Sequence, residues 1–231
     1  MSGDSFFIMI TNLLEGTQYY YKAFIKIGDF FLCGKEGSFK TLFTLAPIDL
    51  GLSVRWANAN IESDKPEDYG NSYAWGETHI KHSSNGYKWW TQYNGFRKYN
   101  TRPDFGHVVD YLKRLDPVDD IAHVILGEKW RMPTENEWRE LVDKCSWSWI
   151  SRNGVNGCKV VGTNGNSIFL PAAGDLNRTG RYCAGEYGRY WSASLWANEP
   201  TQAWGVYFNS FTRSVYTYDR SSGLSIRPVM D

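Results

Sequence analysis

The clearest hydrophobic pattern along the chain lies between Lys129 and Cys145. Within it, Trp138, Leu141, Val142 and Cys145 are spaced i, i+3, i+4 and i+7, which places them on one face of a helix. The pattern therefore predicts a helix buried along that face. The segment contains no recognisable set of catalytic residues.

The start of this helix is also marked in the sequence. Thr134 is a favoured N-cap, and Glu137 three residues later completes a capping box, in which each side chain satisfies a backbone N–H group of the other residue. Pro133 precedes the cap and is placed to pack on Trp138 as a hydrophobic staple. We therefore expect the helix to begin directly after Thr134.

A second, shorter helix is predicted between Asp116 and Gly127. Asp116 is a suitable N-cap, Pro117 suits the first helical position, and Gly127 favours termination. The apolar residues of its expected buried face are Val118, Ile121, Ala122 and Ile125.

Asp119, Asp120 and His123 are close enough on this helix to suggest a metal site. The alternative is that the two carboxylates complement the positive end of the helix dipole and that the histidine is solvated. We favour this alternative. His79 and His82 lie in a polar loop without a third type of ligand nearby, so we expect no zinc site there.

Short apolar runs bounded by turn residues predict antiparallel strands in much of the remaining chain. In the N-terminal part these runs are residues 6–10, 19–27, 38–42 and 52–57. In the C-terminal half they are residues 146–150, 157–163, 167–170, 190–194, 203–208, 213–218 and 224–229. The glycine-rich residues 174–189 predict a loop, and residues 79–104 predict a long aromatic loop that is either functional or held by its own aromatic side chains. We favour aromatic anchoring.

The composition narrows the possible partners. The 231 residues include 25 Lys and Arg and 25 Asp and Glu, so the formal charge is zero and gives no electrostatic reason to expect nucleic acid as a partner. No apolar run approaches the length of a membrane span, and the N-terminus lacks the pattern of a signal peptide. We therefore expect no membrane insertion by this chain, and an export signal, if the natural protein has one, outside it.

The four cysteines are Cys33, Cys145, Cys158 and Cys183, and no CxxC pair occurs among them. Their spacing argues against a zinc knuckle or a thioredoxin-type site. Cys145 and Cys158 are expected to be packed thiols, and the sequence leaves a disulfide between them open.

The N-terminal segment resembles part of a known β-sandwich. Residues 13–19, with the sequence LLEGTQY, are similar to the E–F corner of fibronectin type III domains, where Leu13 and Tyr19 would form a tyrosine corner. The similarity covers only the last three strands of such a domain. We therefore interpret residues 1–42 as a partial fibronectin type III-like segment, 43–49 as a linker and 50–231 as the main domain.

Longer motifs mark the main domain from about Asp49 to Val229. LSVRWANANI, PEDYGNSYAWGET, WRMPTENEWRELVDKCSWSW, NGVNGCKVVGTNGNSIFLPAAG, YWSAS and LSIRPV resemble the Fibrobacter succinogenes major paralogous domain family. That family is common in secreted and surface proteins of gut Bacteroidetes. It is grouped with C-type-lectin-like folds, which include formylglycine-generating enzymes and ligand-binding proteins diversified by retroelements. The resemblance implies an α+β fold with two helices and several short antiparallel strands, and an extracellular or cell-surface location.

The motifs that would give this fold a known chemistry are not found. Formylglycine generation needs a redox-active cysteine pair that holds copper, and calcium-dependent sugar binding needs Glu-Pro-Asn or Gln-Pro-Asp, whereas this chain has Asn198-Glu199-Pro200. We therefore expect a non-enzymatic recognition or adhesion module that binds a protein or a carbohydrate, without a metal or cofactor. The alternative is an enzyme or accessory subunit related to the formylglycine-generating enzymes. Its best nucleophile candidate is Cys183, although an incidental loop thiol is favoured there.

Side-chain alternation locates the expected binding surface on the C-terminal strands. Trp204, Val206, Phe208 and Val215 should point inward, and the residues between them, Gly205 included, should point outward. The predicted ligand-binding residues are Trp196, Asn198, Tyr207, Asn209, Ser214, Tyr216, Tyr218 and Arg220. This mixture of tyrosine with small polar residues and arginine is typical of adaptable binding surfaces, and it resembles the variable positions of the retroelement-diversified relatives. The alternative is that these tyrosines pack under the aromatic loop at 79–104.

Overall fold

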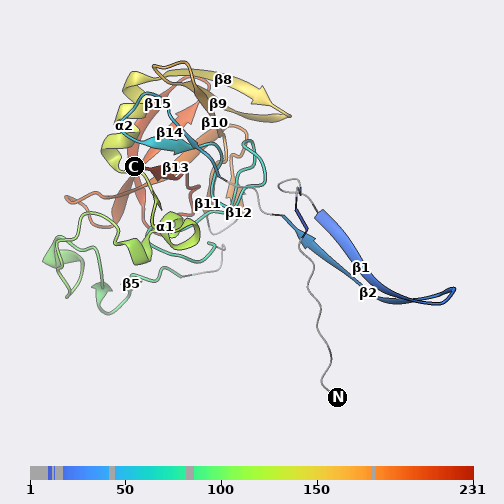
Figure 1. Cartoon of the computed structure of the whole chain (residues 1–231). Helices are drawn as coiled ribbons and strands as arrows, with labels where there is room; N and C mark the ends of the chain where they lie inside the picture. Colours follow the sequence, from blue (N-terminus) through green and yellow to red (C-terminus); the bar gives the residue numbers. More distant parts are fainter. Residues whose placement is uncertain (1–9, 12, 14–17, 42–44, 82–85, 178–179) are drawn as a thin grey trace. The chain divides into compact units, whose positions relative to one another are not determined.

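The computed structural model describes residues 10–11, 13, 18–41, 45–81, 86–177 and 180–231. The chain forms two compact units, residues 1–44 and residues 45–231, which are described separately (Figure 1). The predicted strand at residues 6–10, apart from Ile10, lies outside the described residues. Residues 14–17 of the predicted tyrosine corner also lie outside them.

In the first unit, β1 (Gln18–Ile27) and β2 (Phe30–Lys40) form an antiparallel hairpin. The second strand therefore begins well before the predicted residue 38. The side chains of Phe24 and Phe30 are 65% and 79% exposed. A lone two-stranded ribbon cannot bury both of its faces, which accounts for this exposure.

The larger unit is mixed α+β, as the sequence predicted, and antiparallel strands dominate it. Its strands are β3 (Pro47–Ile48), β4 (Arg55–Ala57), β5 (Trp90–Thr91), β6 (Gly95–Phe96), β7 (Trp130–Arg131), β8 (Ser146–Arg152), β9 (Val155–Val161), β10 (Ser167–Pro171), β11 (Asp175–Asn177), β12 (Gly180–Tyr182), β13 (Tyr187–Leu195), β14 (Gln202–Asn209), β15 (Arg213–Asp219) and β16 (Val229–Met230). Its helices are the 3-10 turns η1 (Pro103–Phe105) and η2 (Pro117–Asp119) and the α-helices α1 (Ile121–Leu126) and α2 (Glu135–Lys144).

The principal sheets of this unit have the strand orders β10-β9-β8, β13-β14-β15 and β3-β4-β16-β7. Pro47 and Ile48, which the sequence placed in a linker, form β3 at the edge of the third sheet. An edge position suits proline, because that residue has no N–H group to donate to a neighbouring strand. The predicted strand at 224–229 is regular only at its end, in β16.

Helix α2 confirms the prediction made from its hydrophobic pattern. Thr134 is the N-cap, and both hydrogen bonds of the capping box with Glu137 are present. The side chains of Trp138 and Leu141 are fully buried. The indole Nε1 of Trp138 donates to the carbonyl of Trp191, 3.1 Å away, and so joins the helix to β13.

The predicted N-cap Asp116 and Pro117 at the first position are present, but they begin the 3-10 turn η2 and not the α-helix. Asp120 has extended backbone angles and is the N-cap of α1, where its carboxylate accepts from the N–H groups of Ala122 and His123. The helix therefore begins four residues later than predicted, and the face that it buries changes. Ile121 and Ala122 are buried, but Val118 is 72% and Ile125 is 44% exposed.

The sheet β13-β14-β15 lies between two hydrophobic cores. Tyr190, Val206 and Phe208 point into the core that contains Trp138 of α2, which lies beside this sheet in Figure 1. Trp191 on the next position of β13 points into the second core. Because both faces are covered along most of the strands, little of this sheet is left for a ligand.

Among the residues that the structure describes, no helix is long and apolar enough to cross a membrane.

Candidate functional site

Strand register brings four of the eight predicted ligand-binding residues together. Tyr207 on β14 lies opposite Ser214 on β15, and Tyr216 lies two positions further along β15. Asn209 shares the same face of β14, and its Nδ2 donates to the hydroxyl of Tyr207 over 2.9 Å. Tyr216 is 61% exposed. Tyr207 is half-buried and packs against the second core, whereas Ser214 and Tyr216 are exposed beyond it.

The expected exposure of Tyr218 is wrong. Tyr218 shares the face of Tyr216 but is only 9% exposed, because the second core covers this end of the sheet. Its ring meets Trp191 edge-on at 5.9 Å. Gly205 permits this packing, since a Cβ atom there would stand 3.1 Å from the Tyr218 ring. The ring contacts of Tyr218 are with Trp191, Tyr216 and Arg189 rather than with the rings of the 79–104 loop.

Arg220 is also buried, and the prediction that it lies on the binding surface is wrong. It is 1% exposed and follows the end of β15, where the chain passes beneath the aromatic loop. Its guanidinium donates to the hydroxyl of Tyr87 and to the carbonyls of Lys98, Tyr99 and Pro200 at 2.9–3.1 Å.

Four aromatic rings surround the same guanidinium. The closest is the Phe96 ring, whose centroid lies 4.4 Å from the guanidinium carbon, and the others belong to Trp75, Tyr87 and Tyr99. Phe96 and Tyr99 are buried. The prediction that this loop is held by its own aromatic residues is therefore confirmed, with Arg220 as their common partner.

Trp196 and Asn198 lie at the opposite end of β14 from Tyr207 and Asn209. They belong to the turn between β13 and β14, where the Trp196 N–H group donates to the carbonyl of Gln202. The carbonyl of Asn198 accepts from Arg102 of the loop at 3.0 Å. The structure thus separates these two residues from the other exposed members of the predicted site.

Arg189, Tyr187 and Asp175 belong to the candidate site but were not predicted from the sequence. Residues 174–189 were assigned to a loop, but β13 begins at Tyr187, and Arg189 lies opposite Tyr207 in the sheet. The guanidinium carbon of Arg189 is 4.6 Å from the ring centroid of Tyr187, 5.3 Å from that of Tyr218 and 6.0 Å from that of Tyr207. Extending the alternation of β13 backwards from Trp191 would have placed Tyr187 and Arg189 on this face.

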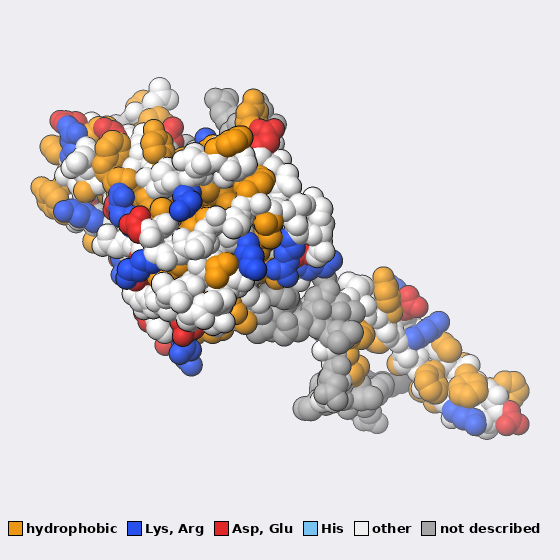
Figure 2. Space-filling view, turned by 90° about the horizontal axis from the view of Figure 1, so that it is seen from above, with side chains coloured by type: hydrophobic (Ala, Val, Ile, Leu, Met, Phe, Trp, Pro, Cys, Tyr) orange, Lys and Arg blue, Asp and Glu red, His pale blue; other side chains and the backbone are white. Residues whose placement is uncertain are grey.

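We call this surface the Arg189 face. It consists of Tyr187, Arg189, Tyr207, Asn209, Ser214 and Tyr216. On the larger unit in Figure 2, hydrophobic, basic and acidic side chains are interspersed rather than gathered into one charged field.

On the Arg189 face the positive charge of Arg189 is paired with Asp175, and the hydroxyl groups around it are protonated. Asp175 lies 3.2 Å from Arg189 and accepts a hydrogen bond of 2.9 Å from the hydroxyl group of Tyr187. Burial raises the pKa of Tyr187, and the hydrogen bond to Asp175 raises it further. Burial also raises the pKa of Tyr218, against the opposing effect of Arg189. At neutral pH these tyrosines are therefore neutral donors and acceptors.

Two polar groups beside this face have no hydrogen-bond partner within the described part of the chain. They are the Nε of Arg189 and the hydroxyl of Tyr218, both inaccessible to solvent. The arginine is therefore less completely bonded than Arg220. A site of this kind can bind through rings, hydroxyl groups and one cation.

No cluster suited to metal binding is formed by the described residues: no three His, Cys, Asp or Glu side chains come together. Asp119 is instead bound by the ammonium group of Lys98 at 2.7 Å and by the hydroxyl of Tyr99 at 2.7 Å. All four cysteines are free thiols, so Cys145 and Cys158 form no disulfide in this structure. Burial raises the pKa of the Cys158 thiol to about 12.

A family model described as the Lcl C-terminal domain matches residues 67–230, a range that contains α2, the sheet β13-β14-β15 and the Arg189 face. The chain belongs to the Lcl C-terminal domain family. This Lcl family is of the Fibrobacter-type paralogous kind that the sequence motifs indicated, and membership is compatible with a surface protein. No curated protein and no solved structure matches the chain.

Proposed function

We propose that this chain is a non-enzymatic extracellular recognition or adhesion module that binds a protein or a glycan through the Arg189 face. The observation that supports this proposal is the cluster of tyrosine rings around Arg189, on the face of the sheet opposite the core that contains Trp138. A C-type-lectin-like fold for the larger unit and a fibronectin type III-like origin for residues 1–42 belong to the same proposal, as does a location at the cell surface.

The chemistry of the face suits recognition. Tyrosine provides a large contact area at a low cost in side-chain entropy, and Asn and Ser add adaptable hydrogen bonds. Tyr207 and Tyr216 project from paired strands, so their rings are held in place before a ligand arrives. Such preorganisation reduces the entropy lost on binding.

A combined glycan and host-protein array, probed with the intact chain, tests this proposal. We expect at least one ligand whose binding is weakened by Tyr216→Ala and by Arg189→Met. Tyr111→Ala is the matched control, because Tyr111 is 69% exposed but lies outside the Arg189 face. A ligand whose affinity falls equally with all three substitutions, or with none of them, would count against the Arg189 face.

Thiol-reactivity profiling separates this proposal from the enzyme alternative. The buried thiols of Cys145 and Cys158, with their raised pKa values, should react slowly. Cys183 is partly exposed, and we expect it to react at the rate of an ordinary accessible thiol. A Cys183 that reacts far faster than the exposed Cys33 would instead favour an enzyme.

A further inference from the structure

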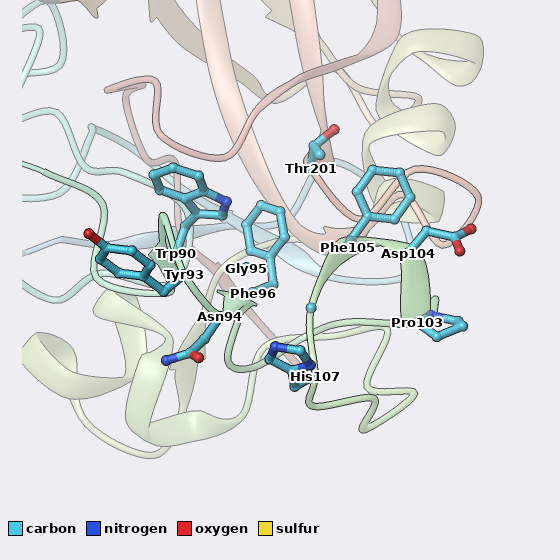
Figure 3. Close-up of a pocket in the computed structure, with 11 residues that line it drawn as sticks. Trp90, Tyr93, Asn94, Gly95, Phe96, Pro103, Asp104, Phe105, His107 and Thr201 are labelled. Atoms are coloured by element: carbon cyan, nitrogen blue, oxygen red, sulfur yellow. The ribbon is translucent and has the colours of Figure 1, made fainter.

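A second surface of the larger unit forms a groove beside the aromatic loop, separate from the Arg189 face. The groove has a volume of about 350 Å³ and is lined by Trp90, Tyr93, Asn94, Phe105, His107 and several neighbours. Figure 3 shows Trp90 and Tyr93 on one side of this space and Phe105 on the other. We call it the Trp90 groove.

The floor of the groove is backbone rather than side chain. The segments around Gly95 and Gly106 are bridged, and the N–H group of His107 donates to the carbonyl of Asn94. A Cβ atom at Gly95 would lie 2.2 Å from the carbonyl oxygen of Phe105, and one at Gly106 would lie 2.4 Å from that of Phe96. Only glycine allows this approach, so the two glycines set the width of the groove.

Two aromatic rings at the rim are exposed and a third is buried. Trp90 is 49% and Tyr93 is 88% exposed, whereas Phe96, which pairs with Trp90 across β5 and β6, is buried against Arg220. Large aromatic side chains that stay exposed on a supported loop are typical of contact surfaces. A second cavity of about 240 Å³ continues the groove and shares Trp90, Phe96 and Thr201 with it. The combined space exceeds what a single small ring would fill.

The charge of the groove argues for a neutral occupant. Asp104 is paired with Arg102 at 3.0 Å, and the continuing cavity is lined by both Asp219 and Arg220, so the charges of the two signs offset each other. The remaining polar side chains at the rim, Asn94, His107 and Thr201, offer hydrogen-bond donors and acceptors beside the rings. The lining is thus aromatic and polar together, and its volume lies within the range of about 300–1,000 Å³ that is typical of small-ligand sites.

We propose that the Trp90 groove binds a neutral oligosaccharide of β-1,4-linked glucose or xylose units. In these pyranoses the hydroxyl groups are equatorial, so each sugar has flat C–H faces that stack on Trp90 and Tyr93. The hydroxyl groups at its edges then meet the amide and imidazole groups of Asn94 and His107. This site is distinct from the Arg189 face, and either can fail without the other.

Isothermal titration calorimetry of the full chain with cellohexaose and xylohexaose tests the proposal. We expect binding of at least one of them in the millimolar range or tighter. Trp90→Ala should weaken it by about tenfold or more, as removal of a central aromatic contact does, and Tyr93→Ala should weaken it to a smaller extent. Tyr111→Ala is the matched control and should leave the affinity unchanged, because Tyr111 is exposed but lines neither the Trp90 groove nor the Arg189 face.

Two further probes distinguish other occupants. A galacturonate hexamer is also an unbranched sugar chain, but it is anionic. A decaproline peptide forms the extended helix that aromatic grooves also bind. Tighter binding of either probe than of the neutral sugars would overturn the proposal. It would also be overturned if neither neutral sugar bound at millimolar concentration. Circular dichroism of the Trp90 variant ensures that a loss of binding is not a loss of folding.

Discussion

Two arginines of the larger unit lie among tyrosine and other aromatic rings, yet their surroundings differ. Arg220 is 1% exposed, and each nitrogen of its guanidinium donates to a described partner. Arg189 is partly exposed, pairs with Asp175 and leaves its Nε without a partner among the described residues. The first arginine therefore fixes the aromatic loop, and the second is available at the surface.

The different burial of the two arginines explains why they have different roles. Burial lowers the pKa of Arg220, although nearby tyrosines oppose this effect. The cost of burying that cation is offset only because carbonyls and rings replace water on every side. The Arg189 side chain is still 30% exposed, so a ligand can reach the cation and gain from contact with it. The following variants test this contrast, beginning with the largest expected effect.

Arg220→Met should destabilise the larger unit by about 3–5 kcal/mol, as the loss of one partner from a buried charged network does. Three backbone carbonyls would lose their donor, and the loop rings would lose their common contact. Urea denaturation measures the change. Arg220→Lys should restore little of the loss, because an ammonium group cannot reproduce the planar fork of donors. A change below about 1 kcal/mol would show that Arg220 does not hold the loop.

Tyr218→Phe should increase stability or leave it unchanged, with a gain of up to about 1 kcal/mol. The hydroxyl of Tyr218 is buried without a described partner, and removing such a group relieves a desolvation penalty. Thermal and urea denaturation measure the change. The same substitution at Tyr99, whose hydroxyl donates to Asp119 at 2.7 Å, should be destabilising and is the matched comparison. A clear loss of stability for Tyr218→Phe would reveal a hydrogen bond that this structure does not contain.

Arg189→Met should destabilise the larger unit by about 1 kcal/mol, well below Arg220→Met, because Arg189 is partly exposed although its partner Asp175 is buried. The same variant should lose affinity for any ligand of the Arg189 face. Paired measurements of unfolding and of ligand binding check both parts. If Arg189→Met were as destabilising as Arg220→Met, the distinction between the two arginines would be lost.

Tyr216→Ala should have the smallest effect on stability, within about 0.5 kcal/mol, because most of its ring is in solvent. It should nevertheless weaken ligand binding by about 1–2 kcal/mol if Tyr216 is a central contact. Titration of the array-identified ligand provides this measurement. Unfolding of the variant would instead place Tyr216 in the core.

Local sequence patterns predicted the elements of this protein well where one short segment decides the outcome. The capping box at Thr134 and the buried face of Trp138 and Leu141 depend on neighbours within one helix, and they are as predicted. Asp116 begins only a 3-10 turn, and the α-helix starts after a second suitable cap, Asp120. Asp120 also accepts from the N–H group of Met132, a contact across twelve residues that a local pattern does not reveal.

The candidate site shows where alternation alone fails. Alternation assigned Tyr216 and Tyr218 to one face, and they do share it, but it could not show that a second core covers only Tyr218. Arg220 could not be predicted either, since its partners come from residues 87–99 and 200, far away in sequence. Arg189 was missed for a simpler reason, because the glycines around it obscured the start of a strand.

The sheet covered on both sides has a consequence for how this protein could diversify. Folding of the sheet depends mainly on the residues that point into the two cores, such as Trp191, Val206 and Phe208. Ser214 and Tyr216 are exposed, so their identities affect the packing little. Asn209 differs, because its side chain accepts from the N–H groups of Phe211 and Thr212 in the turn between β14 and β15. A library randomised at Ser214 and Tyr216 should therefore yield mostly folded members with different ligands. The architecture separates a constant scaffold from a replaceable surface.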